Sequence, residues 1–426
     1  MIRKVYPVIV SFLLLTISCQ ASAVTAPMLN HAPPLLTPEA TEAATASSIS
    51  APSTITATSR STSTAASTLT PVPTPTTSPT AVPAPIHAMR LDFTNYEASR
   101  AEVARDEQLM RAAGINMVNL GAGRVEWTYF KWAGHEANWS NDVKDTGIDF
   151  LAEDSTRFKQ WAQVDAVIDV LSPNYIRAHP DKAAVSFGGV RSTDLVSTAE
   201  LTHGQFGQDL LAMIDYVAAN YPVDSISITE LFYHSDGFGP DDKALYLAYT
   251  SRQDWPRLTD GTIDHNDVSI GNWRTHELDV YLDQAVAIAH KYDKQLFLDV
   301  GLSTDFGTTL EALERVTNEH GTNYNVVLEH MDKIVIWGYF ALDEGFPTGF
   351  FQDIGQFLGK FGRDRVILSI GLWGRSAPSI SANDLENAIL ASQAGGTMNF
   401  WITPITLMSA ADWQVLDKLW GIPSSP

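Results

Sequence analysis

Acidic residues stand at the ends of apolar, β-branched runs in this chain of 426 residues. Glu230 lies at the end of the run Ser225–Leu231, and Asp299 lies within the run Gln295–Val300. A carboxyl group enclosed by apolar side chains keeps its proton to a higher pH and can donate it to a leaving group. Glycoside hydrolysis needs two carboxyl groups on either side of the sugar linkage. We therefore take Glu230 as the candidate general acid/base, with Asp299 or Asp236 as the candidate second carboxylate.

Both main candidates have a structural alternative. If Ile226 and Ile228 face the surrounding helices, strict alternation also turns Glu230 outward, where an Arg or Lys under a helix would pair with it. An inward Glu230 then requires a bulge at the strand end. An outward Asp299 would place an unpaired charge against a helix, which is unfavourable by several kcal/mol, so we expect it to point inward. There it serves either as the second carboxylate or as a group that only orients another by hydrogen bonds.

Further residues near the same strand ends suit the binding of sugars. Pyranose rings pack their C–H faces on aromatic rings, while acids accept hydrogen bonds from sugar hydroxyls. The candidate substrate-binding residues are Asp92, Tyr233, Asp241, Trp337, Tyr339, Trp373 and Trp401. The alternative for each aromatic residue is that it caps the core. Spacing alone does not rank these acids against the comparable residues Asp169, Asp242, Asp343 and Glu344.

Other functional classes find little support in the sequence. It has no GxSxG, HExxH or Walker motif and no GxGxxG after a strand, and its histidines are scattered. The single cysteine, Cys19, leaves no partner for a disulfide or a cysteine-based zinc site. We predict neither a metal nor a cofactor. The formal net charge of −21 would repel phosphate backbones and anionic lipids, so we expect no nucleic-acid partner.

Strand and helix patterns alternate from Ile86 onward, which is typical of a parallel sheet with crossover helices. The predicted strands are His87–Phe93, Asn116–Leu120, Ala166–Leu171, Ser225–Leu231, Gln295–Val300, Lys333–Tyr339, Arg365–Leu372 and Thr397–Ile402. The predicted helices are Ser99–Ala113, Thr156–Gln163, Gly207–Asn220, His276–Tyr292, Thr308–Glu319, Phe350–Phe361, Ala382–Ala394 and Ala410–Leu419. Eight such units predict an α/β fold, a (β/α)8 TIM barrel. The length beyond a typical barrel of about 250 residues falls in two long βα loops after strands 3 and 4, His179–Phe206 and His234–Thr275.

The N-terminal residues predict a signal peptide followed by a linker. Residues 1–19 have the form of a signal peptide, with an apolar stretch shorter than the about 20 residues of a membrane-spanning helix. The run Leu15–Cys19 resembles a lipobox, in which Cys19 becomes lipidated, and Ala21–Ala23 is the alternative cleavage site of an ordinary signal peptidase. Residues 20–85 are rich in Ser, Thr, Pro and Ala, which predicts a disordered linker before a barrel domain at 86–426.

The order of landmarks over most of residues 86–420 resembles the secreted barrels called glycosyl hydrolase-like family 10, a bacterial family whose members are often lipoproteins. The residues that carry this resemblance are Met89–Asp92, Asp224–Tyr233, Asp241 with Tyr246 and Tyr249, Trp273–Arg274, and Asp332–Val335 with Tyr339. In the fourth strand, Thr229 and Glu230 stand where that family has two acids. The resemblance implies a carbohydrate-active barrel.

These observations together predict a glycoside hydrolase that acts on an extracellular or cell-wall polysaccharide or oligosaccharide by paired-carboxylate catalysis. We expect it outside the cytoplasm, either secreted or on the cell surface, with a lipid on Cys19 as its only membrane contact. Two alternatives remain open. One is a glycan-binding surface lipoprotein without turnover, and the other is a polysaccharide lyase or deacetylase on the same barrel.

Overall fold

The computed structural model describes residues 84–91, 99–231, 233, 235–301, 322–339, 350–374 and 377–421, all within the unit Pro83–Pro426. Its barrel strands are β1 (His87–Arg90), β2 (Met117–Arg124), β4 (Gln163–Asp169), β7 (Ser225–Thr229), β8 (Gln295–Gly301), β9 (Lys333–Gly338), β10 (Val366–Gly371) and β11 (Phe400–Thr403). Neighbouring strands pair in parallel, and β1 pairs with both β11 and β2, which closes the barrel. The predicted TIM barrel is confirmed, and each predicted strand overlaps an observed one.

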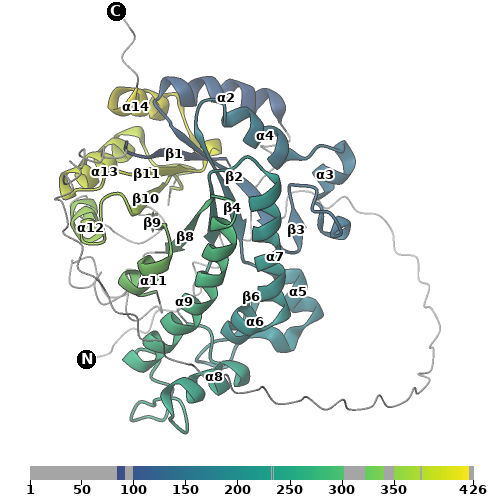
Figure 1. Cartoon of the computed structure of the whole chain (residues 1–426). Coiled ribbons are helices and arrows are strands. Elements are labelled where there is room, and N and C mark those ends of the chain that lie inside the picture. Colours follow the sequence, from purple (N-terminus) through teal and green to yellow (C-terminus); the bar gives the residue numbers. More distant parts are fainter. Residues whose placement is uncertain are drawn as a thin grey trace, which may run out of the picture. The chain divides into compact units, whose positions relative to one another are not determined.

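Helices surround the barrel (Figure 1). They are α2 (Arg100–Ala112), α4 (Phe150–Phe158), α7 (Gln205–Asn220), α9 (Val268–His290), α11 (Tyr324–His330), α12 (Phe350–Gly359), α13 (Ala382–Gly395) and α14 (Ala410–Trp420). The prediction of a helix at Thr156–Gln163 is wrong in its bounds, because Asp149 caps α4 through the Ala152 N–H and the helix ends at Phe158. The predicted helix Thr308–Glu319 lies outside the described residues.

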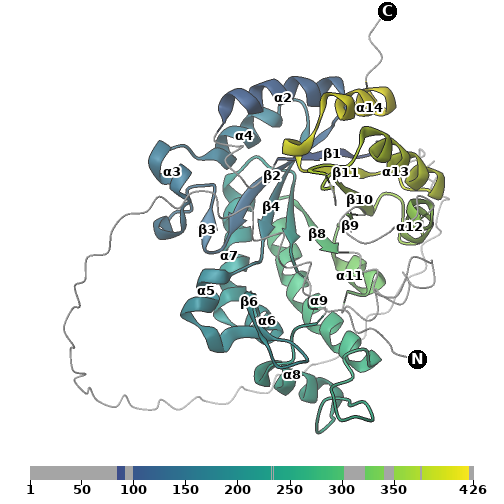
Figure 2. The same ribbon diagram turned by 180° about the vertical axis from the view of Figure 1, so that it is seen from behind.

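The two long loops contain secondary structure of their own. After β4 come α5 (Pro173–Ala178), η4 (Pro180–Lys182), the antiparallel pair β5 (Ala183–Val185) and β6 (Arg191–Val196), and α6 (Thr198–His203). After β7 comes α8 (Pro240–Thr250). Both views show β6, α6 and α8 at the end of the barrel where α9 begins (Figures 1 and 2). A crossover helix begins near the end of its preceding strand, so these additions extend the wall around the mouth, the end of the barrel where the strands terminate.

Shorter elements complete the described chain. β3 (Trp127–Thr128) pairs antiparallel with β2, and η3 (Glu136–Asn138) and α3 (Asn141–Thr146) follow it. η5 (Ile405–Leu407) follows β11. None of the helices that the structure describes combines the length and the apolar character needed to cross a membrane.

Alternation along the strands separates two cores. The larger one lies between the strands and the helices and includes Ile226 and Ile228. The smaller one fills the barrel interior with Ile86, Ala88, Met117, Val167, Phe297, Val335, Ile367 and Trp401. Side chains two residues further along each strand also point into the barrel and therefore face the mouth. A (β/α)8 barrel places its functional residues there.

Candidate active site

Glu230 follows β7 directly, and its backbone breaks the alternation of that strand. Ile226 and Ile228 belong to the outer core, whereas the hydroxyls of Ser225 and Ser227 donate hydrogen bonds inside the barrel. Strict alternation would therefore turn Glu230 outward. Its φ is instead 65°, a left-handed conformation that is uncommon for a residue other than glycine and is often found at functional sites. The charged groups that act on its side chain belong to the mouth, so Glu230 points there and not toward the helices.

The charged groups that act most strongly on Glu230 are Asp169, Arg90, Asp299 and Arg124, which with Glu230 form the mouth cluster. The pKa of Glu230 is raised from an ordinary value of 4.5 to about 8, and the partial loss of water around the carboxyl group is the largest cause. The negative charges of Asp169 and Asp299 act in the same direction, and the two arginines oppose it. Glu230 therefore holds a proton at neutral pH, as a general acid must.

Asp299 lies on β8, the strand beside β7, one residue beyond the registered pair Ile228 and Leu298. The indole Nε1 of Trp337 donates a hydrogen bond to its Oδ1 atom, and the Nη1 atom of Arg90 lies 3.9 Å from its Oδ2 atom. Burial raises the pKa of Asp299 to about 6, while the charge of Arg90 is the main opposing effect. Asp299 is thus largely ionised at the pH at which Glu230 is largely protonated.

Two further carboxyl groups, Asp169 and Asp165, lie on β4 beside this pair. Asp169 accepts hydrogen bonds from Arg124 Nε at 2.8 Å and from the Leu171 N–H at 2.7 Å, and Arg124 Nη2 lies 2.7 Å from the same carboxylate. It stands in register with Thr229, the residue before Glu230. Its charge therefore helps to keep the proton on Glu230.

The second of these groups, Asp165, lies deeper in the barrel. It is fully buried and accepts hydrogen bonds from Ser225 at 2.6 Å, Ser227 at 2.7 Å and Asn119 at 3.0 Å. Burial raises its pKa. Asp165 and Asp169 are four residues apart, so in a strand they share one face. That spacing is the sequence signal for Asp165, but the predicted strand began at Ala166 and left it out.

Three predicted aromatic residues form a row beside Asp299. The rings of Trp337 and Tyr339 stack with centroids 5.2 Å apart and planes 5° from parallel. The ring of Trp373 follows, 5.0 Å from that of Tyr339 at an angle of 60°. The charges of Asp299 and Glu230 are among the effects that raise the pKa of Tyr339, after burial as the main one. The row therefore lies along the mouth cluster.

The other predicted aromatic residues lie deeper. Trp401 is 1% exposed, belongs to the interior core, and has the Arg90 guanidinium carbon 6.0 Å from its ring centre. It therefore forms a floor beneath the mouth cluster. Tyr233 is buried in the outer core. Neither residue offers a broad open face to a sugar in this structure.

The loop acids have partners of their own. The Asp236 carboxyl accepts a hydrogen bond from Ser235 at 3.2 Å, and its backbone carbonyl accepts one from Arg274. Asp241 accepts from Ser197 at 2.7 Å, which ties α8 to α6. Of the remaining named residues, Asp92, Asp343, Glu344 and Cys19 lie outside the described residues. In the described part of the chain, no three His, Cys, Asp or Glu side chains gather as metal ligands would.

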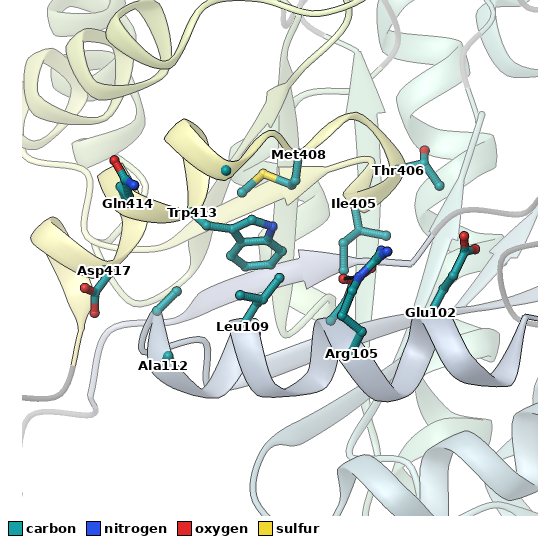
Figure 3. Close-up of a pocket in the computed structure, with 13 residues that line it drawn as sticks. Glu102, Arg105, Leu109, Ala112, Ile405, Thr406, Met408, Trp413, Gln414 and Asp417 are labelled. Atoms are coloured by element: carbon teal, nitrogen blue, oxygen red, sulfur yellow. Dashed lines mark hydrogen bonds and ion pairs between the residues drawn. The ribbon is translucent and has the colours of Figure 1, made fainter.

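A surface pocket lies outside the barrel, between α2 and α14 (Figure 3). Glu102, Arg105 and Leu109 of α2 line one wall, and Met408 and Trp413 line another. None of the residues that line it belongs to the mouth cluster. We therefore place the candidate active site in the mouth and not in this pocket.

The raised pKa of Glu230 predicts a stability gain in Glu230→Gln. Between about pH 5 and pH 8 the unfolded chain releases this proton while the folded chain retains it. The unfolded state is therefore stabilised by an ionisation that the folded state does not undergo, and the wild type becomes less stable as pH rises. Gln has no proton to lose, and we expect its melting temperature to exceed that of the wild type by roughly 3–6 °C at pH 8. Thermal unfolding followed by circular dichroism at pH 5 and pH 8 measures this difference. A difference that does not grow between the two pH values would contradict the raised pKa of Glu230.

The barrel is similar in fold to solved structures of glycoside hydrolases. The PgaB (BpsB) glycoside hydrolase domain from Bordetella bronchiseptica superposes with a TM-score of 0.61 at 15% identity, over 80% of this chain and 100% of that domain. The catalytic domain of a β-amylase from Paenibacillus polymyxa gives 0.53 at 11% identity, over 79% of this chain and 98% of that chain. No family model and no curated protein sequence matches the chain. The likeness is thus one of fold.

Proposed function

We propose that this protein is a glycoside hydrolase with Glu230 as its general acid/base and Asp299 as its second carboxylate. One observation carries the proposal: two carboxyl groups lie at the ends of neighbouring strands in one barrel mouth, and their surroundings raise one pKa to about 8 and the other only to about 6. Opposite protonation states at one pH are what acid and base roles require. Asp236 is less suited as the second carboxylate because its nearest partners are Ser235 and Arg274.

In the proposed reaction, Glu230 donates its proton to the glycosidic oxygen as the bond to the anomeric carbon breaks. Positive charge then develops on the sugar ring, because the transition state resembles an oxocarbenium ion. The negative charge of Asp299, kept largely ionised by Arg90, stabilises that ring or directs the attacking group. The aromatic row of Trp337, Tyr339 and Trp373 offers flat faces on which the sugar packs.

The finer assignment rests on the sequence. We propose that residues 1–19 direct the chain out of the cytoplasm, that a lipid on Cys19 anchors it, and that residues 20–85 tether the barrel domain at 86–426. The resemblance to glycosyl hydrolase-like family 10 supports a bacterial, secreted protein. The substrate we propose is an extracellular or cell-wall polysaccharide, which a tethered barrel at the cell surface would meet.

The proposal is tested by incubating the full chain with a panel of neutral, basic and acidic polysaccharides. The molecular masses of the products are then determined by mass spectrometry. A hydrolase shortens the chains and adds one water for each bond cleaved. Products with an unsaturated end would identify a lyase, and acetate released without shortening would identify a deacetylase. Binding without any product after long incubation would contradict the enzyme assignment.

A further inference from the structure

An exposed aromatic residue stands on a rigid turn between β5 and β6. The turn is closed by hydrogen bonds from the Ser186 N–H to the Val190 carbonyl at 2.7 Å and from the Val190 N–H to the Ser186 hydroxyl at 3.0 Å. Gly189 permits the sharp reversal with a φ of 82°. Phe187 is 41% exposed on this turn, and Val190 is 70% exposed. The turn therefore fixes a large apolar side chain in contact with water.

One face of the Phe187 ring is already supported. The His265 ring stacks on it with centroids 4.1 Å apart and planes 5° from parallel, and Phe238 meets it at 85° and 6.3 Å. Partial burial lowers the pKa of His265, so the histidine is mostly neutral at neutral pH. The pair thus forms a firm, uncharged aromatic platform, and solvent still reaches a large part of Phe187.

The platform is tied to the loop that carries Glu230. The Phe187 N–H donates a hydrogen bond to the Ser235 carbonyl at 3.0 Å, and the Phe238 N–H donates one to the Val185 carbonyl at 2.8 Å. Ser235 is the fifth residue after Glu230, and five extended residues span at most about 18 Å. The Phe187 backbone is therefore no more than a few sugar lengths from the candidate acid. β6, next to the turn, lies at the mouth end in both views (Figures 1 and 2).

We propose that Phe187, supported by His265, is an outer binding site for a sugar unit of the same glycan chain whose linkage lies at Glu230. This inference rests on the proposed function. An aromatic ring with an open face binds the C–H surface of a pyranose, and a ring held rigidly loses little entropy on binding. The net charge of −21 disfavours acidic glycans. The site therefore takes a segment without acidic groups.

The alternative is that Phe187 only covers the aromatic cluster beneath it. That cluster consists of Phe238, Tyr246, Trp255, Ile270 and Trp273. If Phe187 served only as its cover, its removal would change stability and leave glycan affinity as it was. The two roles are therefore separated by measuring affinity and melting temperature on the same variants.

Affinity for glycans is measured by electrophoresis in native gels that contain hydroxyethyl cellulose, laminarin, glycol chitosan or alginate. The proteins compared are the full-length wild type and its variants Phe187→Ala, Phe187→Trp and Val190→Ala. Val190→Ala is the matched control because it trims an exposed apolar side chain of the same turn. We expect Phe187→Ala to weaken binding to a non-acidic polymer roughly fivefold. Phe187→Trp and Val190→Ala should bind as the wild type does, and alginate should retard none of them.

The outcomes distinguish this inference from the proposed function. Equal retardation of Phe187→Ala and wild type, in a polymer that the wild type cleaves, overturns the outer site and leaves the hydrolase proposal intact. Loss of retardation in Phe187→Ala without cleavage of that polymer by the wild type supports the binding site and counts against the hydrolase. Retardation by none of the polymers overturns the outer site.

Discussion

Replacing Glu230 with glutamine is expected to lower the rate of glycan hydrolysis by roughly 10²–10⁴-fold, the usual contribution of a general acid/base. Glutamine keeps the shape of the side chain and its place at the end of β7, but it has no proton to give to the leaving oxygen. Glutamine and glutamate share the same unbranched stem, so the left-handed backbone at this position places the same demand on both. The loss should therefore be in kcat, which initial rates at pH 7 on a cleaved polysaccharide measure.

Glu136→Gln is the matched control for this variant, because Glu136 is an exposed residue of η3. It should retain the wild-type rate. A rise in the melting temperature of Glu230→Gln, as expected above, would show that its loss of activity is not a loss of fold. A Glu230→Gln enzyme within about twofold of the wild-type rate would exclude Glu230 as the general acid, given the usual size of that contribution.

Asp299→Asn is expected to lower kcat by roughly 10²–10³-fold, the size of effect seen when one electrostatic contact to a transition state is removed. The amide still fits beside Trp337 and Arg90, but it carries no negative charge to oppose the positive charge on the sugar ring. Residual activity should also lose its decline below about pH 6, because Asp299 is the group that takes up a proton there. Rates of wild type and variant across pH 5–9 test both expectations.

Asp145→Asn, at an exposed position of α3, controls for the general effect of removing one acid from the chain. It should follow the wild-type pH dependence. Persistence of the acidic decline in Asp299→Asn would mean that another carboxyl group, such as Asp169, is responsible for it.

The barrel was predictable because every strand had a local signal. Each of the eight predicted strand runs overlaps an observed strand, and glycines mark several of the helix ends. The direction in which the Glu230 side chain points was harder to predict from the sequence. Periodicity places it outward, and only the φ of 65° returns it to the mouth. A local backbone conformation that neighbouring structure imposes leaves no periodic trace in the sequence.

The residues that make up the mouth cluster could not be predicted from the sequence either, because closure of the barrel brings them together. Arg90 and Asp299 come from strands that are not neighbours, yet their side chains lie 3.9 Å apart across the mouth. Long-range pairs of this kind follow from strand order and tilt, which one-letter spacing does not contain. Trp401 was misplaced for a related reason. Its position near the end of a strand predicted a residue at the rim of the mouth, but its side chain belongs to the interior layer of the barrel.

The pH dependence of kcat/KM for the wild-type enzyme tests most directly whether Glu230 and Asp299 divide the acid and base roles. The rate should rise as Asp299 loses its proton near pH 6 and fall as Glu230 loses its proton near pH 8. We predict a bell-shaped profile with its maximum between these values. A rate that stays constant from pH 7 to above pH 9 would contradict a protonated Glu230 as the acid.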